Sequence, residues 1–256
     1  MQNFYLKEMM EHGLPAALSK DPGGPEGLPE NFVIVIGREF GSGGRTVGKI
    51  ISEKLGIKYY DTELLSKAAR SVGVSDEIFL AQDEKRPSPL RAFLQGAYGI
   101  PDNFHTVPLT GERIYSTQCR VIKDLCKKNS CVIVGRNADF VMRSHPHLLS
   151  VFLHSPIEMR AQRILERKEA ATFQEACDMA SRHDRQREAY YNFYTGEKRW
   201  GSASNYHLSL DTSCLDNETV ADIIISLAKK KFSRNEVCRS AAGGEESPGN
   251  NGRHAF

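Results

Sequence analysis

The sequence predicts an α/β domain in which five parallel strands form a sheet covered by helices on both faces. Short apolar runs occur in order along the chain, and helical patterns stand between them. The runs show no alternation of polar and apolar residues, which is typical of strands buried on both faces, and a parallel sheet covered by helices requires such strands. The predicted strands span residues 32–37, 57–60, 131–135, 148–154 and 206–211.

Two helices carry clear signals for their first residues. Ser155, Pro156 and Glu158 supply an N-cap, a proline for the first helical position and an acid for a capping box. A helix is therefore expected directly after the fourth strand. Thr172 and Glu175 repeat the capping box and predict the start of the next helix.

Both ends of the chain are expected to lie outside the folded domain. Residues 1–30 and 233–256 are rich in Pro, Gly, charged and small polar residues, which bury too little apolar surface to fold. The predicted domain, residues 31–232, ends in a helix over about residues 218–231, where a lysine run suits the negative end of the helix dipole. Residues 86–112 break the regular patterns with Pro, Gly and aromatic residues, so we expect a mobile or substrate-covering segment there and no second domain.

Charge and cysteine content exclude several classes of protein. The chain has 34 Lys and Arg against 32 Asp and Glu, for a formal net charge of +2. This balance argues against a general binder of nucleic acid or membrane surfaces. The six cysteines form no CxxC pair, and no apolar run has the length of a signal peptide or a membrane span. We therefore expect a reduced, cytoplasmic protein, whose oligomeric state the sequence does not indicate.

A glycine-rich turn follows the first strand, in the stretch VIVIGREFGSGGRTVGKI. A strand, such a turn and a helix start together aim backbone N–H groups and the positive helix end at one point, which suits a phosphate. The dinucleotide pattern G-x-G-x-x-G started at Gly41 has Thr46 in place of its last glycine. The phosphate-loop pattern has Gly44 where its lysine is expected. A tight turn without a ligand is the alternative interpretation.

Nearby residues offer replacements for the missing lysine. Arg45 or Arg38 would supply the positive charge as a planar fork, and the hydroxyl of Thr46 offers a ligand to Mg²⁺. The predicted phosphate site consists of Gly41, Ser42, Gly43, Gly44, Arg45 and Thr46.

Basic residues concentrate after the fourth strand. Arg160, Arg163 and Arg167 share one helical face, and the simpler interpretation is a solvated stripe paired with nearby acids. The stretch RHDRQREAYYNFY instead interleaves arginine with Asp184 and aromatic residues. Arginines that close over a nucleotide neutralise the charge on a moving phosphoryl group. An amphipathic helix whose tyrosines pack on the core is the alternative for this stretch.

Together these stretches resemble the cytidylate kinase-like family, a branch of the nucleoside monophosphate kinases within the phosphate-loop fold. The matching stretches are GREFGSGGRTVGKIISEKLGIKYYDTELL, VPLTGERIY, CVIVGRNADFVM, DRQREAYYNFYTGEKRW and SNYHLSLDTS, in the family's order over about residues 32–230. A GSGGR loop without the lysine is usual in this branch. The resemblance implies a three-layer α/β/α fold with a five-stranded parallel sheet, an acceptor-binding region near residues 61–112 and a helical lid near residues 172–200.

The resemblance also implies roles for individual residues. Tyr60 and Asp61 lie where cytidylate kinases begin their acceptor site. Arg136 matches the arginine that grips the acceptor phosphate, and Asn137 follows it. The D-x-x-R spacing of the lid places an arginine near the phosphates and an aspartate near the acceptor sugar. The implied catalytic residues are Arg45, Arg136, Asp184 and Arg187, and the implied lid arginines are Arg182, Arg185 and Arg187.

Two residues depart from the better-known cytidylate kinases. Gly44 replaces the loop lysine, and without a substitute for that charge turnover should be slow. Asn137 replaces the acid that follows their Gly-Arg pair, and an Asn both donates and accepts hydrogen bonds whereas an Asp only accepts. Cytosine specificity is therefore carried by the resemblance alone.

The expected activity is Mg²⁺-dependent transfer of the γ-phosphate of ATP to a nucleoside monophosphate, with CMP or dCMP first. The expected partners are ATP and this small acceptor, without nucleic acid or membrane. Two alternatives stay open: a kinase of another small metabolite on the same fold, and a nucleotide-binding regulatory protein with weak catalysis. The missing lysine favours the second alternative, whereas Thr46, Arg136, Asp184 and Arg187 argue against it.

Overall fold

The computed structural model describes residues 27–65, 111–196 and 198–242, with the backbone alone at 111–114 and 234–242. The predicted covering segment lies outside the described residues, apart from its last two positions. Most of the two predicted terminal segments also lies outside them.

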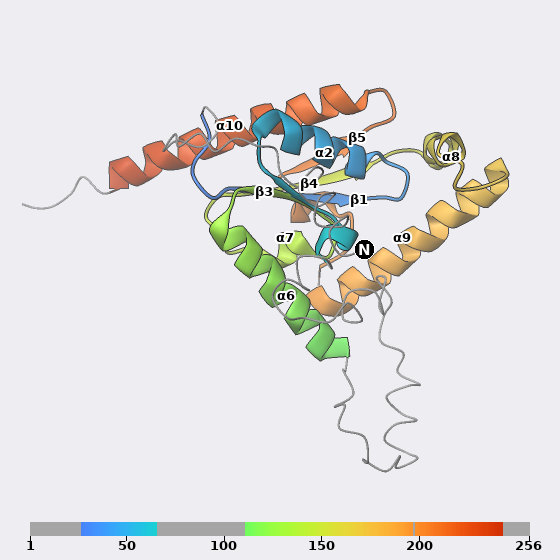
Figure 1. Cartoon of the computed structure of the whole chain (residues 1–256), viewed down its shortest axis with the longest axis horizontal. Helices are drawn as coiled ribbons and strands as arrows, with labels where there is room; N and C mark the ends of the chain where they lie inside the picture. Colours follow the sequence, from blue (N-terminus) through green and yellow to red (C-terminus); the bar gives the residue numbers. More distant parts are fainter. Residues whose placement is uncertain (1–26, 66–110, 197, 243–256) are drawn as a thin grey trace, which may run out of the picture.

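Five parallel strands form one sheet in the order β2-β3-β1-β4-β5 (Figure 1). The parallel sheet predicted from the apolar runs is therefore confirmed, and every predicted strand overlaps an observed one. The strands are β1 (Val33–Arg38), β2 (Lys58–Tyr60), β3 (Cys131–Val134), β4 (Leu148–His154) and β5 (Leu208–Asp211).

Helices connect the strands and extend from the sheet. The helix after β4 begins at Ile157 with Pro156 at its N-cap, so the proline lies one position earlier than predicted. The predicted capping box opens α9, because Thr172 Oγ1 accepts from the N–H of Glu175 at 3.2 Å. The last helix continues to Ala242, beyond its predicted end. The helices are α2 (Gly44–Leu55), α6 (Gly111–Lys128), α7 (Ala138–Val141), α8 (Ile157–Glu166), α9 (Phe173–Thr195) and α10 (Asn217–Ala242), with a short 3-10 helix at Ala203–Asn205.

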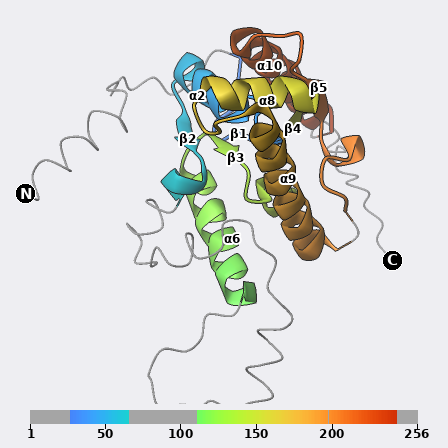
Figure 2. The same cartoon turned by 90° about the vertical axis from the view of Figure 1, so that its right-hand side faces the viewer.

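The sheet is the middle of three layers. Helices α2 and α10 cover one face, and α6, α7 and α9 lie on the other (Figures 1 and 2). Successive side chains of a strand point to opposite faces. Ile34 and Ile36 of β1 accordingly pack in the cluster of α2 and α10, and Val33 and Val35 pack in the cluster of α6 and α7. The central strand thus holds both layers together.

The tyrosines at the end of α9 pack against α6. The rings of Tyr115 and Tyr194 are stacked with their centroids 3.9 Å apart, and the Tyr190 hydroxyl donates to Gln118 Oε1 at 2.9 Å. This half of α9 is therefore fixed to the body of the domain. Its other half extends toward α8 and the loop after β1 (Figure 2).

Among the described residues, no helix combines the length and apolar character needed to cross a membrane. The cysteines whose side chains are described are free thiols, and the sulfur atoms of two of them, Cys126 and Cys131, lie 3.6 Å apart in the core. The free cysteines are Cys119, Cys126, Cys131, Cys177 and Cys214.

Candidate active site

The carboxyl ends of the parallel strands meet at one edge of the sheet, which is where ligands bind in open α/β folds. The loop after β1 (residues 39–43) and the turn after β3 (residues 135–137) both lie at this edge. The residues predicted for phosphate binding and for the acceptor arginine are therefore brought to the same side of the molecule.

The loop after β1 presents the start of α2. Gly43 is the N-cap with φ 89°, and no side chain caps the helix. The first bond of the helix runs from the N–H of Val47 to the carbonyl of Gly43 at 3.0 Å. The amides of residues 44–46 precede that bond and have no partner within the helix, and together with the positive end of the helix dipole they give the arrangement that suits an anion. A side chain at position 43 would also meet Asn217 Oδ1 at 2.6 Å from its Cβ.

Arg38 occupies the space beside this loop. It is the last residue of β1, and only 7% of it is exposed. Its guanidinium lies against Gly135, where an added Cβ would come within 2.2 Å of Nη1. By contrast, Arg45 and Thr46 are exposed in the first turn of α2.

A charged network joins the loop to α8 and α9. Arg160 is buried, and its guanidinium pairs with Asp184 and, at 3.3 Å, with Glu39. It also donates to the carbonyl of Phe40 at 3.2 Å. Arg187 Nη1 lies 3.5 Å from Asp184 Oδ1, so the two predicted lid residues contact each other.

A second set of contacts fixes the loop from the side of β5. Arg163 donates from Nη1 to Thr212 Oγ1 at 3.0 Å and from Nη2 to the carbonyl of Thr212 at 2.6 Å. The Thr212 hydroxyl donates to the carbonyl of Ser42 at 3.0 Å. Arg160 and Arg163 thus hold the loop, and the interpretation of their helical face as a solvated stripe is wrong for these two residues.

The turn after β3 has an uncommon backbone. Gly135, Arg136 and Asn137 have φ values of 86°, 57° and 51°, so three successive residues are left-handed. Such angles are rare for residues with a side chain, and they are found where a site constrains the backbone. Arg136 is only 3% exposed and Asn137 only 8%.

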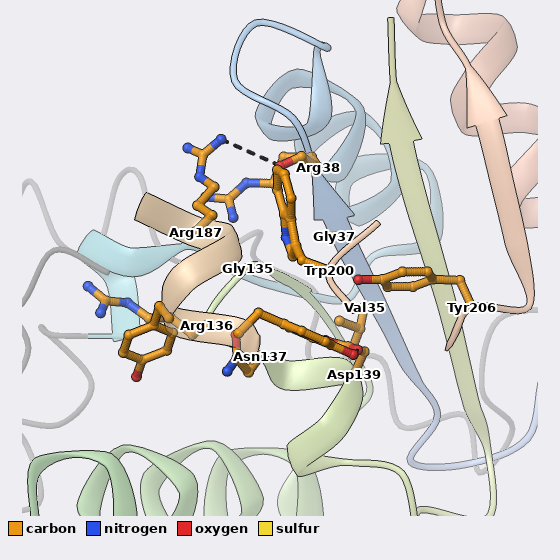
Figure 3. Close-up of a pocket in the computed structure, with 12 residues that line it drawn as sticks. Val35, Gly37, Arg38, Gly135, Arg136, Asn137, Asp139, Arg187, Trp200 and Tyr206 are labelled. Carbon is orange, nitrogen blue, oxygen red and sulfur yellow. Dashed lines mark hydrogen bonds between the residues drawn. The ribbon is translucent and has the colours of Figure 1, made fainter. Parts of the chain in front are cut away.

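A narrow pocket lies between β1, this turn and α9 (Figure 3). Its volume of about 20 Å³ has room for a single water molecule. A larger ligand would therefore require the side chains around it to move. The charged and polar residues that line it include Arg38, Arg136, Asn137, Asp139 and Arg187.

Aromatic residues and one buried acid close the pocket. Asp139 Oδ2 accepts a hydrogen bond of 2.8 Å from the Tyr191 hydroxyl. Burial raises the pKa of Asp139 above its ordinary value, because the carboxylate is largely removed from water. Trp200 packs edge-on against Phe152 with the centroids 5.3 Å apart, and Tyr206 also lies against Phe152.

The two residues predicted for the acceptor site at the end of β2, Tyr60 and Asp61, have structural roles. Tyr60 packs in the apolar core, and burial raises its pKa to about 12. Asp61 caps the helical turn that follows, because its Oδ1 accepts from the N–H groups of Glu63 at 3.1 Å and Leu64 at 3.0 Å. The neighbouring Tyr59, whose hydroxyl lies 3.4 Å from Asp61 Oδ2, contacts Gly48 of α2 on the opposite face from Tyr60.

The predicted lid arginines divide into two groups. Arg187 lines the pocket and donates to the carbonyl of Arg38 at 3.4 Å. Arg182 and Arg185 are exposed on α9. The structure therefore brings one of the three lid arginines to the pocket.

Comparisons with known proteins agree with this architecture. A sequence model of the cytidylate kinase-like family matches residues 33–214. A protein named cytidylate kinase from Methanosarcina barkeri (strain Fusaro / DSM 804) is 25% identical over 185 residues, which cover 72% of this chain and 89% of the relative.

Two solved structures are similar to this chain. An uncharacterized protein from Eubacterium ventriosum ATCC 27560 is 27% identical with a TM-score of 0.58, over 77% of this chain and 98% of its own. A shikimate kinase from Acinetobacter baumannii is 15% identical with a TM-score of 0.42, over 78% and 93% of the two chains. The match of the family model extends from the first strand of the sheet to the residues just after the last, and it includes the glycine-rich loop, the turn after β3 and α9. The chain therefore belongs to the cytidylate kinase-like family, and its three-layer domain has the phosphate-loop kinase fold.

Proposed function

We propose that this protein transfers the γ-phosphate of ATP to a nucleoside monophosphate, with Mg²⁺, and that CMP or dCMP is the first acceptor to test. The main observation behind this proposal is that Arg38, Arg136 and Arg187 line one pocket beside the glycine-rich loop. Three arginines that line one pocket give it a positive potential, which favours the binding of anionic ligands. Two phosphate-bearing substrates are anions of this kind.

The loop and the turn after β3 divide the binding task. The amides at the start of α2 would hold the phosphates of the donor. Arg136, on the turn after β3, would hold the phosphate of the acceptor with its planar fork. Arg187 would approach the transferred group from α9, where its contacts with Asp184 and the carbonyl of Arg38 fix its position.

The reaction requires no covalent intermediate. The bond between the γ-phosphorus and its bridging oxygen breaks, and ADP leaves with that electron pair. An oxygen of the acceptor phosphate forms the new bond to phosphorus. That oxygen is already anionic at neutral pH, so no base is needed, and the arginines act by alignment and by neutralising charge.

The loop fits a magnesium ion that is held mainly by the nucleotide. Mg²⁺ prefers oxygen ligands and usually keeps several waters beside one or two protein groups. Thr46 is exposed in the first turn of α2 and offers one hydroxyl. Among the residues that the structure describes, no group of three His, Cys, Asp or Glu forms a protein cage for a metal. When bound, Mg²⁺ would neutralise charge on the donor phosphates.

The choice of acceptor rests on two observations. The Methanosarcina relative is named a cytidylate kinase. Asn137 follows the acceptor arginine, is almost fully buried and lines the pocket, so its amide is available to read a base that enters there. An amide both donates and accepts, which suits the amino group and ring nitrogen of cytosine.

The test is ADP formation by the purified protein with Mg-ATP and each nucleoside monophosphate in turn. An Arg136→Ala variant is measured beside the wild type, and Arg143→Ala is the control. Arg143 is exposed just after α7, and its side chain lies over the ring of Phe140 and donates to the Phe140 carbonyl. We expect acceptor-dependent turnover that Arg136→Ala lowers by about 100-fold, because a charged contact to the acceptor phosphate is lost.

The control variant should keep the turnover of the wild type. If Mg-ATP binds and no nucleoside monophosphate raises ADP formation above the blank, the proposed function is wrong. A loss of equal size in Arg136→Ala and Arg143→Ala would show that the arginine after β3 does not hold the acceptor.

A further inference from the structure

We propose that Arg38, the last residue of β1, supplies the positive charge that a loop lysine supplies in other phosphate-loop kinases, and that Gly44 is a glycine because the stem of Arg38 lies over it. The inference rests on the proposed kinase function and assigns Arg38 as a catalytic residue. It would contact the transferred phosphoryl group.

The first observation behind this inference is the lack of space for a side chain at position 44. Gly44 is the first residue of α2, and it is buried. A Cβ added to Gly44 would lie 3.0 Å from both Cβ and Cγ of Arg38, and 3.5 Å from Ile36 Cγ2. The two distances of 3.0 Å are tighter than ordinary carbon contacts. The stem of Arg38 therefore occupies the position into which a longer side chain at residue 44 would begin to grow.

The guanidinium of Arg38 carries the second step. From Gly44 the side chain reaches Gly135, where a Cβ would meet Nη1 at 2.2 Å and Cζ at 2.8 Å. The side chain of Arg38 therefore runs from the first residue of α2 to Gly135, the neighbour of Arg136, and both arginines line the same pocket (Figure 3). In the proposed reaction, a phosphoryl group that passes from a donor on the loop to an acceptor on Arg136 would pass beside this cation.

Arg187 fixes the backbone from which Arg38 extends. Arg187 Nη1 donates to the carbonyl of Arg38 at 3.4 Å (Figure 3). Arg38 is also paired into the sheet opposite Leu153 of β4. A cation held by a central strand is already in place before the substrate arrives, and preorganised charge of this kind lowers a barrier without reorganisation.

Arg45 is the other candidate for this charge, and its position differs. It is exposed on α2, whereas Arg38 is buried at the pocket. An exposed charge is screened by water and salt, and its effect on a reacting group is correspondingly small. The buried position assigns the role to Arg38.

The first experiment separates the charge of Arg38 from its packing. Arg38→Met keeps an unbranched stem over Gly44 and removes the charge, and Arg38→Lys keeps the charge. We expect kcat to fall by about 100-fold in Arg38→Met, the size of effect seen when one preorganised donor to a transition state is lost. Arg38→Lys should recover at least about tenfold of that loss. Lys49→Ala, an exposed cation on α2, is the control and should keep the wild-type kcat.

A binding experiment tests the same assignment without turnover. Affinities for ADP and for a non-hydrolysable ATP analogue are measured by displacement of a fluorescent nucleotide, with Mg²⁺ present. Arg38→Met should bind ADP within about threefold of wild type and lose about tenfold or more for the ATP analogue, which is the loss of one charge-assisted contact to the γ-phosphate. Retention of the wild-type preference for the ATP analogue would overturn the assignment.

The exchange of the two positions is the sharpest test. Gly44→Lys alone should lower kcat, because its stem meets that of Arg38. In the Arg38→Gly background both Cβ and Cγ are gone, and Gly44→Lys should raise kcat at least about tenfold above Arg38→Gly alone, which is at least about 1.4 kcal/mol of coupling. Thermal unfolding of every variant shows that the comparison is made between folded proteins.

The outcomes for the inference and for the proposed function are distinct. If the wild type shows no acceptor-dependent turnover, the proposed function fails, and the binding experiment still decides on Arg38. If the wild type is active and Arg38→Met keeps its kcat, or if Arg45→Ala loses more than Arg38→Met, the inference about Arg38 is wrong while the kinase function stands.

Discussion

Asp184 Oδ1 accepts a hydrogen bond of 2.7 Å from the backbone N–H of Phe40, and this bond connects α9 to the glycine-rich loop. The same carboxylate pairs with Arg160 and contacts Arg187. Its two oxygens therefore hold the loop backbone, a buried arginine of α8 and an arginine of α9 together. One side chain therefore links the loop to both helices.

Asp184→Asn should destabilise the fold and weaken nucleotide binding. The change removes the charge that pairs with Arg160, whose side chain is only 9% exposed. Glu39 still pairs with Arg160 in this variant, so the loss of stability should be smaller than the roughly 3 kcal/mol of a buried ion pair that is broken completely. Urea denaturation measures the free energy of unfolding. The control is Asp178→Asn, since Asp178 lies on α9 and bonds to exposed Gln174. Equal stabilities of the two variants would contradict the role of Asp184.

Gly43→Ala should weaken nucleotide binding, whereas Gly56→Ala, which has a similar cost in stability, should not. Gly43 and Gly56 are both left-handed glycines, at opposite ends of α2, so an alanine at either costs about 1–2 kcal/mol of strain. At Gly43 the new Cβ would also meet Asn217 Oδ1 at 2.6 Å, whereas at Gly56 the space is open. We expect at least about tenfold weaker ADP binding for Gly43→Ala, or about 1.4 kcal/mol, and wild-type binding for Gly56→Ala. Calorimetric titration gives the ADP affinity of each variant. Similar affinities would show that the loop accommodates the new Cβ at position 43 without loss of binding.

The fluorescence of Trp200 should report on the pocket. Trp200 is the only tryptophan of the chain, and it lines the pocket edge-on to Phe152. Since the pocket is too small for a nucleotide, entry of an acceptor must displace its lining and change the surroundings of the indole. Titration of CMP into the wild type should shift the emission, and Arg136→Ala should require a much higher CMP concentration. An unchanged spectrum at saturating acceptor would place the acceptor elsewhere.

Asp139 should make the stability of the protein fall as the pH rises. Burial raises the pKa of Asp139 above the ordinary 3.8, so the folded state binds the proton more tightly than the unfolded state does. Stability is then lost as the pH increases from 3.8 through the raised value. Asp139→Asn does not titrate, and its carbonyl oxygen can still accept from Tyr191. The stability of the variant relative to wild type should therefore grow between about pH 4 and pH 8 in urea denaturation. A difference that shrinks with pH would mean that folding favours the carboxylate.

The sheet could be predicted from the sequence because its strands are buried on both faces. Continuous apolar runs such as CVIV leave no other environment for those residues, and the runs coincide with the strands that form. The capping box at Thr172 is equally local, because its partners lie within one turn. The sequence of a short strand does not show which of its side chains point to which face of the sheet. β2 has three residues, and nothing in its sequence decides that Tyr60 packs on the side of α6 and α7 while Tyr59 packs on the side of α2.

The candidate site was predictable where a motif carries it and unpredictable where tertiary contacts do. The glycine-rich loop follows from its local pattern, and Arg136 follows from the resemblance to the family. Arg160 does not, because its partner Asp184 lies 24 residues away and its spacing on α8 is also that of a solvated stripe. The choice between Arg38 and Arg45 likewise depends on burial, which the sequence of the loop does not encode.

The left-handed turn after β3 has a consequence for the evolution of acceptor choice. Asn137 must keep φ near 51°, and among residues with side chains only Asn and Asp adopt such angles readily. Most other residues with a side chain would strain the backbone there by about 1–2 kcal/mol. If Asn137 reads the base as proposed, a change of acceptor should therefore arise more easily at residues around the turn than at position 137 itself.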